Sequence, residues 1–123
     1  MSAPHYPGRA PIEAYGNGGF RFAGMSHRGS ILCLPSGVVA WSVMSAAELT
    51  EDDFSAVFAE RDAISFLLLG MGRSVGVVPA GLRKLFVGAK VGLEPMDTGA
   101  ACRTYNVLLA EGRPVAAALI AVD

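Results

Sequence analysis

The chain has 123 residues, of which 52% are hydrophobic and 17% are charged. This composition excludes an intrinsically disordered protein, which would combine low hydrophobicity with high net charge. At roughly 100–200 residues per domain, the length predicts one domain spanning residues 1–123. Ten basic and eleven acidic residues give a net charge of −1, so there is no overall positive field to attract nucleic acid or an anionic membrane.

The first 18 residues are rich in proline and glycine, and we expect a loosely held N-terminal arm there, followed by an α/β core over residues 19–123. The segment does not resemble a signal peptide, because no charged head precedes an apolar run. Phe20-Arg21-Phe22 then alternates apolar and polar residues, as a strand with one solvated face does.

Residues 30–34 and 38–43 are predicted to form a β-hairpin around the turn signal Pro35-Ser36-Gly37. The uncharged stretch 29–47 approaches the length of a membrane helix. Its central turn and its β-branched and aromatic residues favour two short strands instead, so we expect no membrane span. Trp41 on the second strand is expected in the core or as a lid over the sheet.

Predicted helices and buried strands alternate through the rest of the chain. Helices are expected to begin at Thr50, at Pro79 and at Asp97, which serves as an N-cap, and the last should run to about residue 110. Residues 64–69 and 115–122 are continuous apolar runs, typical of strands covered on both faces, and residues 91–94 predict a short strand between them. The order predicts a three-layer α/β domain: a central mixed sheet, helices on both faces and an N-terminal β-hairpin extension.

Short motifs follow one another at defined spacing: Tyr15-Gly16, Gly19-Phe20-Arg21, Gly70-Met71-Gly72, Met96-Asp97-Thr98, residues 101–106 and residues 115–120. Together they resemble the Mth938-like domain family over residues 12–122. This family of unknown biochemical function includes a mitochondrial assembly factor for respiratory complex I. The resemblance implies a central mixed sheet with helices on one side and a helix plus an extra hairpin on the other. It transfers no catalytic residue, and the absence of a targeting segment favours a bacterial cytoplasmic relative.

Two segments that follow predicted strands form a candidate ligand site, because ligands of open α/β sheets bind beyond the carboxyl ends of parallel strands. Glycine N–H groups and arginine side chains there could hold an anionic small molecule. The candidate residues are Gly70, Gly72, Arg73, Asp97, Thr98, Arg103 and Asn106. A reading without a ligand stays open: a tight glycine turn, Asp97 as a plain N-cap, and Arg103 paired with a carboxylate or with carbonyls of the sheet.

Other chemical sites are weakly supported. Cys33 and Cys102 lie in apolar stretches and are expected to be reduced core thiols. As an alternative, Cys102 beside Arg103 at a helix start could have a lowered pKa and act as a nucleophile. His5 and His27 lack metal-ligand spacing, so we expect no metal site, and no motif predicts a cofactor.

The leading hypothesis is a non-enzymatic interaction or assembly module with an unidentified protein partner in the cytoplasm. The alternative is a small-molecule binding domain, or an enzyme acting on an anionic small molecule, that uses the crevice between residues 70–74 and 97–106. No nucleic-acid partner is expected, and a homo-oligomer is left open.

Overall fold

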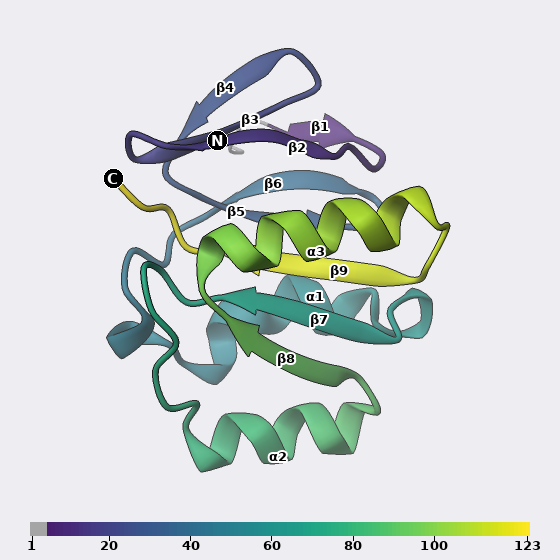
Figure 1. The fold of residues 1–123 in the computed structure, drawn as a ribbon. Helices are drawn as coiled ribbons and strands as arrows, with labels where there is room; N and C mark the ends of the chain where they lie inside the picture. Colours follow the sequence, from purple (N-terminus) through teal and green to yellow (C-terminus); the bar gives the residue numbers. More distant parts are fainter. Residues whose placement is uncertain (1–4) are drawn as a thin grey trace.

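A computed structural model describes residues 5–123, which form two β-sheets and three α-helices (Figure 1). The larger sheet has six strands. In spatial order they are β1 (His5–Pro7), β6 (Gly37–Trp41), β5 (Ser30–Leu34), β9 (Val115–Leu119), β7 (Phe66–Gly70) and β8 (Gly92–Met96). Strands β9, β7 and β8 run parallel, whereas β1, β6, β5 and β9 pair antiparallel, so the sheet is mixed as predicted.

Strands β7 and β9 are adjacent in the middle of the sheet, and both are covered on both faces, as their continuous apolar runs predict. Because side chains alternate along a strand, Leu67 and Leu69 enter one hydrophobic cluster while Leu68 enters the other. All three are buried. A strand that supplies two cores has no solvated face, and its sequence therefore shows no polar alternation.

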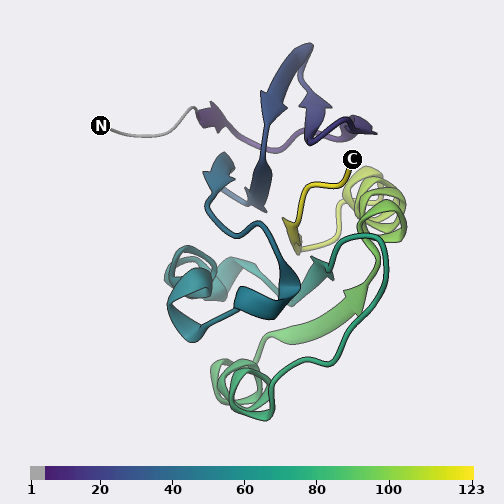
Figure 2. The same cartoon turned by 90° about the vertical axis from the view of Figure 1, so that its left-hand side faces the viewer.

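The two clusters separate three layers, as predicted. One cluster lies between the sheet and helices α1 (Ser55–Ala59) and α2 (Ala80–Ala89), through Phe54, Val57 and Phe86 among others. The second lies under α3 (Thr98–Ala110), through Ala101 and Tyr105. Figure 2 shows α1 and α3 on opposite sides of the sheet.

A separate three-stranded sheet of β2 (Ile12–Gly16), β3 (Gly19–Phe22) and β4 (Met25–Arg28) covers the same face as α3. Asn106 of α3 fixes β2 to the helix: its Oδ1 accepts from the Ile12 N–H at 2.7 Å and its Nδ2 donates to the Ile12 carbonyl at 2.8 Å. The expected loose arm is therefore wrong over residues 5–18, which contain β1 and β2. Residues 1–4 of that arm lie outside the described residues.

Several element bounds differ from the predictions: β6 covers residues 37–41 rather than 38–43, β7 covers 66–70 rather than 64–69, and β9 ends at residue 119 rather than 122. Strand β8 continues through Pro95, which is tolerated because β8 is an edge strand that needs fewer N–H donors. The helix expected from Thr50 begins as a 3₁₀ turn, Glu51–Phe54, at whose start the Asp53 carboxylate accepts from the Thr50 N–H at 2.8 Å. Two further 3₁₀ turns, Ala46–Glu48 and Arg61–Ala63, flank this region. Within residues 5–123 no helix has the length and apolar character needed to cross a membrane.

Candidate functional site

The carboxyl ends of β7 and β9 meet the start of α3 at the fully buried Thr98. Its Oγ1 accepts from the Gly72 N–H at 3.0 Å and donates to the Ile120 carbonyl at 2.7 Å, while its own N–H donates to the Gly72 carbonyl at 2.8 Å. Gly70 packs closely against Thr98: a Cβ atom at position 70 would lie only 3.0 Å from Thr98 Cα. The structure thus brings both predicted segments together, with Gly70, Gly72 and Thr98 as a structural junction.

Two side chains at the start of α3 already have partners within the chain. The Asp97 carboxylate accepts from the Ala100 N–H at 2.8 Å, which confirms its predicted N-cap position. Arg103 donates from Nη1 to the Tyr15 hydroxyl at 3.3 Å. Among residues 5–123, neither a carboxylate nor a sheet carbonyl holds Arg103, contrary to the reading without a ligand, because β2 brings Tyr15 over this end of the helix.

Two neighbouring hollows lie at these strand ends. The first, of about 290 Å³, is lined by Tyr15, Gly72, Arg73, Asp97, Gly99, Val122 and Asp123. The second, of about 520 Å³, extends to Met44 and Gly76 and shares four lining residues with the first: Gly72, Arg73, Val122 and Asp123. Arg73 Nη2 lies 3.9 Å from Asp123 Oδ2 in an exposed ion pair. An anion in the first hollow would therefore share Arg73 with Asp123 and would also face the carboxylate of Asp97.

The remaining candidate residue, Asn106, lies elsewhere. Both ends of its side-chain amide bind the Ile12 backbone, so it positions β2 and does not line either hollow. Sequence reasoning also missed Tyr15, Val122 and Asp123, which line the first hollow. Only Tyr15 carried a signal, through its motif beside Gly16.

Three exposed apolar side chains lie on the two loops that border the second hollow: Met44 lines it, and Val75 and Val77 flank Gly76, which also lines it. Met44, in the loop that follows β6, is 62% exposed, and Val75 and Val77, in the loop between β7 and α2, are 53% and 92% exposed. The hollow lined by Met44 and Gly76 joins the two loops. We call Met44, Val75 and Val77 the apolar loop surface. Single exposed hydrophobic residues are ordinary, but a group of them on adjoining loops is typical of a binding surface.

Comparison with known proteins assigns the family. The family described as "Protein of unknown function (DUF498/DUF598)" matches residues 12–120. The chain belongs to the DUF498 family. An uncharacterised protein of Rhodobacter capsulatus is 40% identical over 117 residues, covering 95% of this chain and 89% of that protein.

The DUF498 domain is also similar to human NADH dehydrogenase [ubiquinone] 1 alpha subcomplex assembly factor 3, at 33% identity over 109 residues. The match covers 89% of this chain and 59% of the assembly factor, so the domain spans about three-fifths of that relative's length. This homology confirms the resemblance drawn from the sequence motifs.

Solved structures agree with the fold. A crystal structure described as an outer membrane protein from Bartonella henselae is 52% identical, with a TM-score of 0.92 and coverage of 96% of this chain and 99% of that one. A Mth938-like domain of Bordetella pertussis is 28% identical, with a TM-score of 0.79 and coverage of 91% and 85%. The DUF498 domain therefore has the Mth938-like fold.

The two cysteines of the DUF498 domain are free and buried, as expected of core thiols. Burial raises the pKa of the Cys102 thiol to about 12, and the opposing effect of the Arg103 charge is smaller. The alternative of a nucleophile with a lowered pKa is therefore wrong. Burial also raises the pKa of Cys33 and of Tyr105. In residues 5–123 no group of three histidine, cysteine or acidic side chains is placed to hold a metal ion.

At pH 8, a thiol reagent should label the folded DUF498 domain about a thousandfold more slowly than the urea-unfolded chain, because only the thiolate reacts and the folded Cys102 pKa lies near 12 rather than 9. The same pKa difference predicts that stability is retained below about pH 9 and falls as the pH rises from about 9 toward 12. Mass spectrometry after timed quenching measures both sites. Labelling of either native thiol at the rate of the unfolded chain would contradict the burial.

Proposed function

We propose that this DUF498 domain is a non-enzymatic, assembly-type module that binds a protein partner through the apolar loop surface. The observation that carries the proposal is the exposure of Met44, Val75 and Val77 on two adjoining loops. Covering such side chains with a partner is favourable by about 25 cal/mol per Å² of apolar surface removed from water. A protein partner that presents an apolar patch fits this surface better than a small polar molecule does.

The polar side chains beside this surface support a structural role for the strand ends. Thr98 and Asp97 satisfy backbone groups, and Arg73 is paired with Asp123. The hydrogen bonds of Thr98 and Asp97 hold together the strand ends from which the loops project. The homology to an assembly factor gives the proposal its second support, since that relative is named for the assembly of another protein.

The proposed compartment is the bacterial cytoplasm. Two free cysteines in the core fit a reducing environment, where disulfides are rare. The relative from Bartonella henselae, described as an outer membrane protein, provides the competing location. Fractionation of cells of the source organism, followed by immunodetection of the native chain, distinguishes the two: recovery with the outer membrane would overturn the cytoplasmic assignment.

Changing Val77 to Asp should abolish partner binding without destabilising the fold, because this side chain is 92% exposed and makes almost no contact in the free domain. Val107→Asp on α3 is the matched control, as Val107 is also exposed but lies outside the apolar loop surface. The tagged native chain and each tagged variant are used to capture proteins in the source organism. The partner is then purified, and its binding to the native chain and to each variant is measured by calorimetric titration. A partner that binds both variants as tightly as the native chain would contradict the proposed surface.

A second candidate function is the binding of an anionic small molecule in the 290 Å³ hollow, favoured by the exposed Arg73 and by Arg103 near its rim. If it is correct, phosphate, nucleotides or carboxylates should raise the melting temperature, and Arg73→Ala should remove the effect. The shift should shrink with salt, since exposed charges are screened over about 8–10 Å. A thermal-shift screen in which no anion stabilises the native domain, or in which Arg73→Ala responds equally, would exclude this candidate.

A further inference from the structure

The small sheet has an open edge at β4, on the side facing away from β3 (Figure 1). β3 and β4 are joined by a two-residue turn, Ala23-Gly24, whose φ angles of 51° and 72° are both positive. Such a turn is closed by a hydrogen-bonded pair, Phe22 and Met25, and the next pair along is not hydrogen-bonded. The backbone N–H and C=O groups of Ser26 and Arg28 therefore point away from β3, toward the open edge.

Two hollows flank β4, one on each face of the small sheet, and Ser26, His27 and Arg28 line both. The outer hollow, of about 460 Å³, is cationic and also contains Arg21. The inner hollow, of about 160 Å³, lies between the two sheets and is mainly apolar. Besides the three shared residues, it is lined by Tyr6, Phe22, Met25, Ile31, Val38, Val39 and Ala40. Among the residues that the structure describes, no carboxylate lines either hollow.

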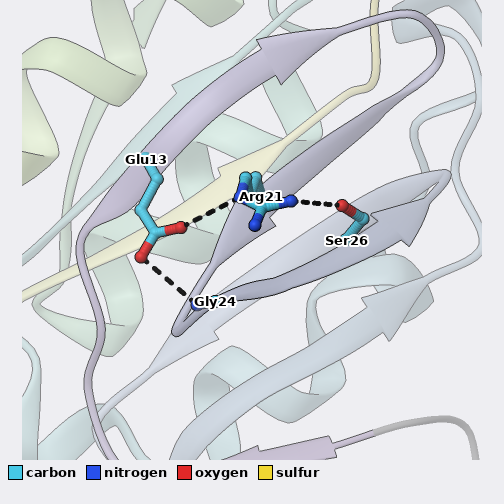
Figure 3. A network of polar contacts seen from close by, with 4 residues as sticks. All are labelled: Glu13, Arg21, Gly24 and Ser26. Carbon is cyan, nitrogen blue, oxygen red and sulfur yellow. Dashed lines mark hydrogen bonds and ion pairs between the residues drawn. The ribbon is translucent and has the colours of Figure 1, made fainter.

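A polar network on the outer face leaves one of the two arginines without an acidic partner. Glu13 Oε1 lies 3.5 Å from Arg21 Nε, and Arg21 donates from Nη1 to Ser26 Oγ at 3.2 Å (Figure 3). The other oxygen of Glu13 accepts from the Gly24 N–H at 3.2 Å, which holds the β3–β4 turn. Within residues 5–123 Arg28 forms no ion pair.

We infer that the open edge of β4 binds an extended peptide segment in which acidic and apolar residues alternate. Such a segment adds a strand through the outward backbone groups of Ser26 and Arg28. Successive side chains of a strand point to opposite faces. The acidic side chains of the bound segment then lie on the outer face, beside Arg28. Its apolar side chains enter the inner hollow, which Met25 lines. This surface is distinct from the apolar loop surface and does not depend on the function proposed there.

The test uses a capped synthetic peptide of alternating glutamate and valine, with lysine in place of glutamate as the control peptide. Backbone NMR of the labelled chain should show shifts centred on Ser26 and Arg28, with slower amide exchange at both, on adding the glutamate peptide. The lysine peptide should leave these signals unchanged. Equal responses to both peptides, or no response at β4, would overturn the inference.

Two variants separate the backbone contribution from the charge. Ser26→Pro removes one outward N–H at an edge position where proline is tolerated, and it should abolish peptide binding. Arg28→Glu keeps the backbone intact, so it remains informative if the proline variant misfolds. We expect about tenfold weaker binding with Arg28→Glu, because a favourable charge pair is replaced by a like-charge contact.

Control variants separate binding at β4 from a change in net charge and from binding at the loops. Arg83→Glu on α2 changes the net charge equally and should bind the peptide like the native chain. Val77→Asp should also bind normally, so failure of the apolar loop surface and failure of the β4 edge are measured separately. If the native chain without peptide protects the Ser26 and Arg28 amides and has twice its monomer mass, a second copy occupies the edge, and the peptide inference is wrong.

Discussion

Replacing Leu68 by alanine should lower the free energy of unfolding by about 2–5 kcal/mol, the usual range for a buried leucine truncation. Leu68 is 1% exposed on the central strand β7, and its side chain packs in the cluster beneath α3. Neighbouring strands on both sides restrict the collapse of the resulting cavity. The midpoint and slope of urea unfolding give the free energy.

The control for this substitution is Val107→Ala, which removes apolar atoms from an exposed position on α3. It should change stability by less than about 0.5 kcal/mol, as surface substitutions usually do. A loss below about 1 kcal/mol for Leu68→Ala would contradict the placement of this side chain in a closely packed core.

Replacing Thr98 by valine should cost about 2–4 kcal/mol, because the shape is kept while two backbone groups lose their partner. The Gly72 N–H loses its acceptor and the Ile120 carbonyl loses its donor at a fully buried position. Amide exchange at Gly72 should accelerate at the same time. Hydrogen-exchange NMR and urea unfolding measure the two effects on one sample.

Thr98→Ser tests whether the hydroxyl is responsible. Serine keeps the oxygen and loses only a methyl group, so most of the stability lost in the valine variant should be retained. If valine and serine destabilise equally, or if valine leaves the Gly72 amide protected, the hydroxyl does not hold the strand ends together as the structure indicates.

The central strands could be predicted from the sequence because their pattern is local. The apolar run through Leu67, Leu68 and Leu69 contains no polar residue. This is typical of a strand whose two faces are both covered, as they are here. The N-terminal strands β1 and β2 were not predicted: β2 pairs with the nearby strand β3, but the contacts that fix both strands to the rest of the domain come from farther along the chain. Ile12 is held by Asn106, 94 residues away, and β1 pairs with β6, so proline and glycine content alone pointed to a loose arm.

The candidate site was predicted in part for the same reason. The meeting of Gly72 with Thr98 follows from the β-α-β order, which places the carboxyl ends of parallel strands at one edge of a sheet. The partners of Arg103 and Asn106 depend on β2, which the sequence did not reveal. The exposure of Val77 depends on the path of the loop between β7 and α2. The sequence alone does not indicate whether an apolar residue in such a loop is buried or exposed.

Site-specific photo-crosslinking in cells of the source organism tests the assembly-module proposal most directly. A photoreactive amino acid is placed at position 77 in the apolar loop surface, or at position 107 on α3 as the matched control. The account predicts one discrete protein adduct from position 77 and none from position 107. No adduct at position 77, or the same set of adducts at both positions, would contradict the proposal that this surface binds a specific protein partner.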